Sequence, residues 1–363
     1  MNKRKNHISV ERRIENFKLY YQMKNRRPLL GFTIGGEYPL HRYKAAKKLP
    51  ENKQLKPDDF GIDLFLKDFD YQFLEHERCG GDFIWGSSAF WGVPWLEASL
   101  GCPIYANHMS GTIFSKVPDN FHGADSIPKF NKNSPWIKKT KKFLIKIAKH
   151  NNGRWPLGTT RMRGISDLLS ALYGNAEFIF RMLDNPVEIE GVCDKLTEFW
   201  IEYGKFQLKY IPLFHGGVGS FNYKFWSPPD TIWHQEDATA LLSPKLYNTF
   251  IRPCDKRIVQ AFSNCIIHLH SVGYVPTEAY INMDVLALEM HIDESLEEIS
   301  SLYNTFIEIL KYKPLLIWCK EKEVEKELDW IFTNLPYEGL AIMVTVSNVE
   351  MAHQLYDKYI VSG

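Results

Sequence analysis

The residues best suited to chemistry lie at the end of one short apolar segment. Residues 264–273 form a run that predicts a buried strand, and this run ends in His268 and His270 just before Gly273. Side chains alternate between the two faces of a strand, so His268 and His270 point the same way. Two imidazoles side by side at a strand end suit metal binding or proton transfer.

A second segment, residues 285–291, repeats this pattern. Its even positions are bulky and apolar, whereas its odd positions end in Glu289 and His291. Such a strand packs helices on one face and delivers polar groups to a site from its C-terminal end. The alternative for each histidine is a hydrogen-bonded residue of the core or its rim. Two neighbouring segments with the same ending favour a functional site.

The composition narrows the class of protein. The 44 basic and 43 acidic residues leave a net charge of +1, which gives no argument for nucleic-acid binding. No apolar run reaches the length of about 18 residues that a membrane span needs. Residues 1–6 are basic, but no apolar region follows, so we expect no secretory signal. The six scattered cysteines form no CxxC motif, which predicts free thiols and a cytoplasmic location.

The elements that must position these residues follow a regular order. Eight short apolar segments are each followed by helical sequence, which indicates parallel βα units. No GxGxxG motif opens a helix after the first of them, which argues against a dinucleotide-binding fold. We therefore predict an α/β protein, a single (β/α)8 TIM barrel over residues 1–363 with an N-terminal helical extension over residues 1–28. The expected strands are residues 29–34, 82–86, 154–160, 231–237, 264–270, 285–291, 315–319 and 340–346.

Two further segments bear on the mouth of such a barrel. Residues 214–219 are rich in glycine but do not follow a strand and open a helix, so we expect a flexible loop over the mouth. Residues 90–95 are mostly aromatic and predict a packed wall that could line the pocket.

Several motifs resemble the uroporphyrinogen decarboxylase superfamily. Residues 158–174, GTTRMRGISDLLSALYG, are followed by LDNP at 183–186, and EDATALLSPKLY at 236–247 is followed by FIRP at 250–253. The order of an acidic strand end, a Leu-Ser-Pro helix start and a strand ending in His-x-polar is the layout of that superfamily. The resemblance covers residues 150–350 well and the first third loosely. It implies a (β/α)8 barrel with a pocket in its mouth.

Departures from the family pattern separate its branches. The decarboxylases carry an arginine-rich N-terminal signature, where this chain has residues 33–39, TIGGEYP. Their pyrrole-binding aspartate has no counterpart in residues 86–91, GSSAFW, so we expect no decarboxylation of uroporphyrinogen. The cobalamin-dependent methyltransferases hold zinc with His-x-Cys at the fifth strand and a cysteine at the eighth. This chain has His268 and His270 at the fifth, no cysteine at the eighth, and Cys319 at the seventh.

The resemblance and the residues together predict a methyltransferase-like enzyme nearer the cobalamin-dependent branch. We expect metal-assisted methyl transfer with zinc bound by His268, His270 and Cys319, or with Glu289 as the third ligand. The methyl group would pass to or from a small molecule, with a corrinoid as substrate or carried by a partner protein. The alternatives are a decarboxylase or lyase that uses His270 and Glu289 as acid and base, and a barrel that binds a ligand or a corrinoid protein without catalysis. The predicted catalytic residues are Asp237, His270 and Glu289, and the predicted substrate-binding residues are Arg161, Arg163, His234, His291 and Trp91.

Overall fold

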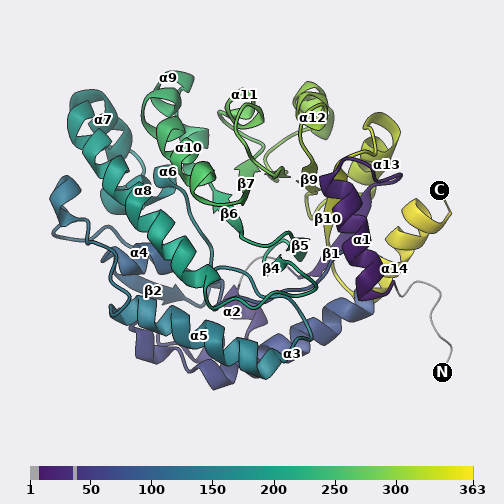
Figure 1. Cartoon of the computed structure of the whole chain (residues 1–363), viewed down its shortest axis with the longest axis horizontal. Helices are drawn as coiled ribbons and strands as arrows, with labels where there is room; N and C mark the ends of the chain where they lie inside the picture. The colour runs from purple at the N-terminus through teal and green to yellow at the C-terminus, as the bar shows by residue number, and fades with distance from the viewer. Residues whose placement is uncertain (1–7, 36–38, 363) are drawn as a thin grey trace.

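The computed structural model describes residues 8–35 and 39–362, and its centre is a parallel six-stranded sheet within a mixed α/β fold (Figure 1). The first strand in sequence pairs with the last, and the remaining strands follow in descending order. The sheet order is β1 (Leu29–Ile34), β10 (Leu340–Val346), β9 (Leu315–Trp318), β8 (Ala287–His291), β7 (Asn264–His270) and β6 (Thr231–Gln235). Six of the eight expected strands are therefore regular strands of one sheet.

The other two expected strands are extended segments joined to their neighbours by isolated contacts. Asp82 N donates to Leu30 O at 2.9 Å, and single parallel bridges join Ser87 to Leu157 and Arg163 to Gln235. These segments therefore lie between β1 and β6, in chain order.

An inserted hairpin explains why these two segments lack regular pairing. Strands β4 (Val218–Ser220) and β5 (Phe225–Ser227) form an antiparallel pair. Gly219 N donates to Leu157 O at 2.8 Å, and Ile84 N donates to Lys224 O at 2.9 Å. Backbone groups of both extended segments thus bond to the hairpin, which interrupts the ladder between them.

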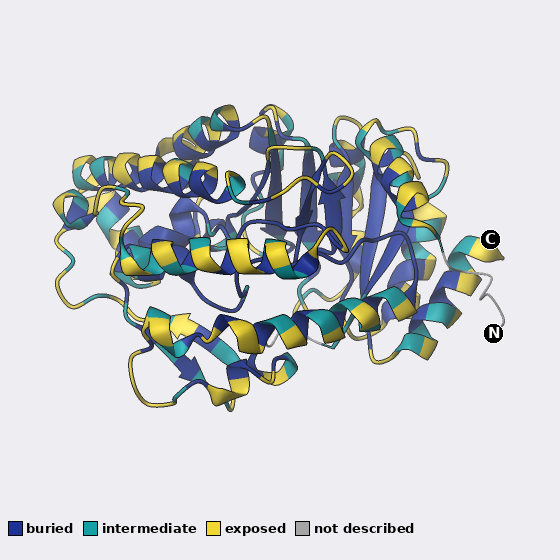
Figure 2. Cartoon of the chain, turned by 60° about the horizontal axis from the view of Figure 1, so that its bottom comes forward, coloured by how far each residue is buried: buried dark blue, intermediate teal, exposed yellow. Residues whose placement is uncertain are grey.

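Helices surround the sheet and turn their exposed sides outward, whereas the strands are buried (Figure 2). Proline stands in the first turn of α5 and of α8, where its missing N–H removes no hydrogen bond of the helix. The longer helices are α1 (Val10–Tyr21), α3 (Ile62–Cys79), α5 (Pro135–Asn151), α6 (Ile165–Tyr173), α7 (Glu177–Asp184), α8 (Pro186–Leu208), α10 (Arg252–Ala261), α12 (Tyr303–Leu310), α13 (Val324–Asn334) and α14 (Val349–Tyr356). Short elements are α2 (Pro39–Arg42), α4 (Trp95–Ser99), α9 (Pro244–Leu246), α11 (Thr277–Ile281), and the hairpin of β2 (Ile104–Asn107) and β3 (Thr112–Ser115).

Helix α1 packs over one end of the strands. Ser9 caps α1 by accepting a hydrogen bond from Arg12 N at 3.3 Å. Phe17 of α1 packs in one cluster with Leu29 and Ile266, which lie near the starts of their strands. Helix α1 therefore covers the N-terminal ends of the strands. Residues 1–7 of the predicted extension lie outside the described residues.

The glycine-rich segment at residues 214–219 lies at this same end, which corrects the expectation of a loop over the mouth. Phe214 pairs with Gly217 through two backbone hydrogen bonds and belongs to the same cluster as Phe17. Trp226 Nε1 donates to Phe214 O at 2.9 Å. The buried aromatic side chains hold the segment beside α1, and the opposite ends of the strands stay free of it.

The described residues contain no helix with the length and apolar character needed to cross a bilayer. All six cysteines are buried free thiols, as their spacing predicts.

Candidate functional site

The two histidines of β7 project from the inward face of the sheet, and each is held by a carboxylate, one from β8 and one from the turn that follows β8. The register places His268 opposite Glu289 and His270 opposite His291. His268 Nδ1 donates a hydrogen bond to Glu289, and His270 Nδ1 donates to Asp293 Oδ1 at 2.7 Å. The expectation that the two histidines share one face is confirmed, because the alternate residues Cys265, Ile267 and Leu269 pack in the helix-facing core.

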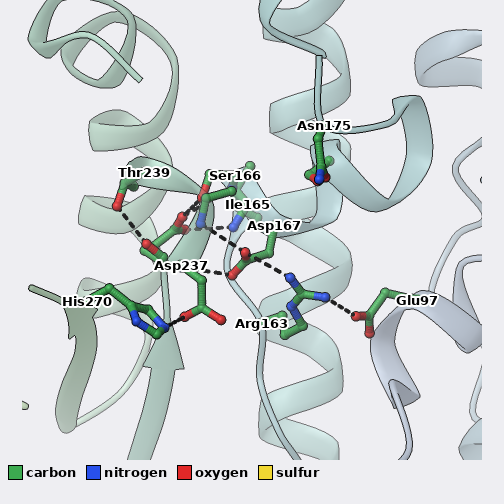
Figure 3. A network of polar contacts seen from close by, with 12 residues as sticks. Glu97, Arg163, Ile165, Ser166, Asp167, Asn175, Asp237, Thr239 and His270 are labelled. Carbon is green, nitrogen blue, oxygen red and sulfur yellow. Dashed lines mark hydrogen bonds and ion pairs between the residues drawn. The ribbon is translucent and has the colours of Figure 1, made fainter. Parts of the chain in front are cut away.

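Asp237 faces the opposite nitrogen of both imidazoles. Its Oδ1 lies 3.4 Å from His268 Nε2. The same oxygen lies 3.8 Å from His270 Nε2 (Figure 3). This oxygen is buried and accepts no hydrogen bond within the described part of the chain. Burial tends to raise the pKa of Asp237, but the charges of His268 and Arg163 outweigh it and lower this pKa. A carboxylate thus lies between two imidazole nitrogens.

The turn that carries Asp237 is held by Asp167 of α6. Asp167 accepts hydrogen bonds from Asp237 N at 3.2 Å and Ala238 N at 3.1 Å. Arg163 neutralises this carboxylate at 3.1 Å and reaches Glu97 at 3.2 Å, as Figure 3 shows. Arg163, which the sequence predicts to bind substrate, therefore serves two buried carboxylates and positions the turn.

Arg161 lies on the same side of its extended segment as Arg163, since the two flank the helix-facing Met162. Its guanidinium lies over the ring of Trp91, 5.9 Å from the ring centre. Its charge contributes to the lowered pKa of Asp237, which places it near the two histidines. The predicted pair Arg161 and Trp91 is thus brought to the site.

His291 completes the group of imidazoles at the ends of β7 and β8. Its ring centre lies 5.4 Å from that of His270 and 6.4 Å from that of His268. Burial lowers the pKa of His291 to about 4, so the ring is neutral at physiological pH. Trp318 of β9 packs edge-on against it at 5.0 Å.

His234 is not brought to this group, which corrects the prediction that it binds substrate. It is fully buried on the helix side of β6, with its ring 5.1 Å from that of Trp200. Its Nε2 lies 2.9 Å from Glu236 and 3.3 Å from Asp255. Burial lowers the pKa of His234, but these two carboxylates outweigh it and raise this pKa to about 10. His234 thus links β6 to α10 through Asp255.

Cys319 also lies on the helix side, which corrects its assignment as the third metal ligand. Side chains alternate, so the inward position at the end of β9 belongs to Trp318, and Cys319 packs in the helix-facing core. Its thiol lies beside Glu327, and burial raises the pKa of the thiol well above its usual range. Glu289, the alternative third ligand, bonds to His268 Nδ1 instead of facing its Nε2.

Sequence reasoning missed two residues of the site. Asp293 lies two positions beyond His291, so one more step of the strand alternation would have found it. Asp167 stands in the first turn of α6, where an acidic residue is also a common helix-end feature. Nothing in the local sequence of Asp167 indicates that it holds a turn 70 residues further along the chain.

The donor set of His268, His270 and Asp237 fits a metal ion. Two ligands of tetrahedral zinc are separated by about 3.3 Å when each lies about 2.0–2.1 Å from the ion. The three ligand atoms all lie within 4.8 Å of one another, and the two nitrogen–oxygen distances are 3.4 and 3.8 Å. The carboxylates on both Nδ1 atoms are the partners that metal-bound imidazoles usually have. With three protein ligands, such a site keeps one position for a substrate atom.

Comparisons with known proteins identify the fold but no family. No protein-family model matches the sequence, and no curated protein is significantly similar to it. Among solved structures, the chain is similar to a methyltransferase from Methanosarcina mazei with a TM-score of 0.61. The match covers 97% of this chain and 99% of that chain at 13% sequence identity. At this identity the likeness establishes a shared fold over nearly the whole of both chains.

Proposed function

We propose that this protein is a zinc-dependent methyltransferase whose metal ligands are His268, His270 and Asp237. The observation that carries the proposal is the orientation of the two imidazoles. Each Nδ1 is bonded to a carboxylate, while each Nε2 faces the same oxygen of Asp237. This is the arrangement that a metal centre needs before the ion binds, because the outer carboxylates fix the ring orientation.

The proposed architecture is a closed (β/α)8 barrel. Support comes from the two extended segments between β1 and β6, which carry single parallel bridges at Ser87 and Arg163. In such barrels the reactive groups lie at the C-terminal ends of the strands, where His270 and His291 end β7 and β8. The barrel and the sequence motifs favour the cobalamin-dependent branch of the uroporphyrinogen decarboxylase superfamily. A protein of this branch would be cytoplasmic.

In this proposal the methyl group moves between a heteroatom of a small molecule and the cobalt of a corrinoid. In the direction of demethylation the carbon–heteroatom bond breaks, and a cob(I) corrinoid supplies the electron pair of the new cobalt–carbon bond. The heteroatom keeps its bonding pair and takes up a proton. A zinc ion, when bound, would act as a Lewis acid on that heteroatom. A donor set without thiolate carries less negative charge, which favours oxygen or nitrogen over sulfur at this position.

The fold of the Methanosarcina mazei methyltransferase supports this class of reaction. Fold alone admits other chemistry, however, and one feature favours a second candidate. The pairs His268–Glu289 and His270–Asp293 would also suit acid–base catalysis in a lyase without metal. A barrel that only binds a corrinoid protein is the non-catalytic alternative.

Elemental analysis of protein purified without chelator tests the metal. We expect about one zinc ion per chain in the wild type. The paired substitution His268→Ala and His270→Ala, and separately Asp237→Ala, should remove it. His122→Ala is the matched control, because His122 is an exposed histidine on a surface loop. Unchanged zinc content in folded variants would show that the ion binds elsewhere, and iron in place of zinc would overturn the zinc assignment.

Turnover separates the remaining alternatives. Purified protein is incubated with cob(I)alamin and a panel of methoxy and N-methyl compounds, and methylcobalamin is followed by its absorbance. Methyl transfer that needs the three ligands supports the proposal. The lyase would be favoured if the purified protein contains no metal but catalyses a decarboxylation, and if His270→Ala alone abolishes that activity. Tight ligand binding with no turnover of any kind would favour the third alternative, a barrel that binds without catalysis.

A further inference from the structure

Two arginines face the interior from the extended segment that precedes α6, and they differ in their partners. Met162 between them packs in the helix-facing core, and its carbonyl accepts a hydrogen bond from Gln235 N at 3.0 Å. Arg161 and Arg163 therefore both project toward the group that contains Asp237. Sequence spacing alone makes the two residues equivalent.

The structure separates them by charge compensation. Arg163 forms ion pairs with Glu97 and Asp167, whose side chains are both 0% exposed. Arg161 forms no ion pair with any residue in the described ranges, 8–35 and 39–362. Its Nε is buried and bonds to no described atom. The ring of Trp91 lies against its guanidinium, with the ring centre 5.9 Å away, in a cation–π contact.

Arg161 is half-buried, with its Nε buried, and within the described residues no carboxylate forms an ion pair with it, so its partial desolvation is not repaid by a direct partner. Burial, followed by the positive charge of Arg163, lowers the pKa of Arg161, which reflects the same cost. An anionic ligand would remove this cost. A guanidinium fork whose face rests on an aromatic ring is suited to bidentate binding of a planar carboxylate.

The surroundings of Arg161 match a flat ligand. Trp91 also lines a cavity together with Trp85, Phe221 and Trp318. Trp318 in turn packs against His291, whose ring centre lies 5.4 Å from that of His270, so one wall of the cavity adjoins the group of imidazoles. An aromatic or otherwise planar body could lie against these rings while its ends reach Arg161 and the proposed metal ligands.

From these contacts we infer that the substrate carries a carboxylate, and that Arg161 on the face of Trp91 is the residue that binds it. The inference rests on the proposed function for its geometry, since the methyl-bearing heteroatom would lie at His268, His270 and Asp237. Arg161 is thus a specificity residue that selects an anionic methylated molecule over a neutral one.

Calorimetric titration with a matched pair of probes tests the inference. The probes are 4-methoxybenzoate and its neutral analogue 4-methoxybenzamide, which differ in the charge of one group. Wild-type protein should bind the carboxylate about tenfold or more tightly than the amide. Arg161→Gln should abolish this preference, and Arg161→Lys should retain part of it, because lysine keeps the charge and loses the fork.

Two controls keep this test separate from the test of the metal. Arg257→Gln removes a surface arginine that pairs with Asp194, so it should leave the preference unchanged. Each titration is repeated after chelator treatment, because bound zinc could itself attract a carboxylate. A preference that survives chelation and disappears in Arg161→Gln supports the inference even if the metal proposal fails. Equal binding of the two probes by wild-type protein, or an unchanged preference in folded Arg161→Gln, would overturn it.

Discussion

At the scale of single residues, the site is organised by which imidazole nitrogen meets which carboxylate. His268 and His270 both use Nδ1 for an outer carboxylate, Glu289 and Asp293. Because the two pairs come from adjacent parallel strands and the turn after them, they turn both Nε2 atoms toward Asp237. The outer carboxylates should therefore control metal affinity without touching the ion.

Weakening either outer carboxylate should lower zinc affinity while the ligands remain. We expect Glu289→Gln and Asp293→Asn each to reduce zinc affinity by about 10- to 100-fold. Competition with a chromophoric chelator measures the affinity. Glu297→Gln, at an exposed position past the end of β8, is the control and should bind zinc like the wild type. If Glu289→Gln and Asp293→Asn both bind zinc as tightly as the wild type, the imidazoles are oriented by other groups.

At the scale of elements, the inserted β4–β5 hairpin shapes the interior. Its backbone approaches the two extended segments so closely that glycine is required at the contacts. A Cβ on Gly158 would lie 2.1 Å from Gly219 O, and this oxygen is a backbone atom that cannot rotate away. The hairpin also carries Tyr223, whose ring lies 5.7 Å from that of His268 and stacks on Trp233 at 4.0 Å. The packing of the hairpin is thus coupled to the packing of the site.

Gly158→Ala should therefore displace the hairpin and destabilise the fold. Overpacking of this kind typically costs about 1–3 kcal/mol. Gly191→Ala is the matched control, because its Cβ would meet only Ala124 Cβ at 3.7 Å inside α8. Alanine in a helix should leave stability unchanged or raise it by about 1 kcal/mol. Urea unfolding curves measure both, and equal midpoints for the two variants would contradict the close contact.

At the scale of the whole molecule, the N-terminal and C-terminal ends of the strands have different roles. Helix α1 and the aromatic residues of the hairpin fill the N-terminal end of the strands, where the ring centre of Phe17 lies 4.6 Å from that of Phe225. The polar groups gather at the other end. Helix α1 is therefore part of the core, and its contribution should appear as stability and not as metal binding.

Phe17→Ala tests this division. Phe17 is 0% exposed, and removing a buried phenylalanine typically costs about 3–5 kcal/mol. Phe180→Ala on α7 is the control, because Phe180 is 58% exposed and should cost far less. Guanidinium unfolding gives the stability, and zinc content of the folded variant gives the state of the site. Loss of zinc from folded Phe17→Ala would show that the two ends are coupled.

Local sequence determined what depends on periodicity and on chain order. Alternation in residues 264–270 and 285–291 separates polar from apolar faces, so it predicts that His268, His270, Glu289 and His291 face one side. Proline and serine at helix starts, and the repeated order of strand and helix, predict the α/β class and most element positions. These are short-range properties that a chain segment carries with it.

Tertiary structure decided what depends on partners far along the chain. Residues 315–319 are apolar on both faces, so their sequence does not tell that Trp318 points inward and Cys319 outward. The same ambiguity hides the outward orientation of His234. The role of Asp237 depends on a turn held by Asp167, and the difference between Arg161 and Arg163 depends on Glu97 and Asp167. Such choices are made by long-range packing and charge pairing, which no local pattern encodes.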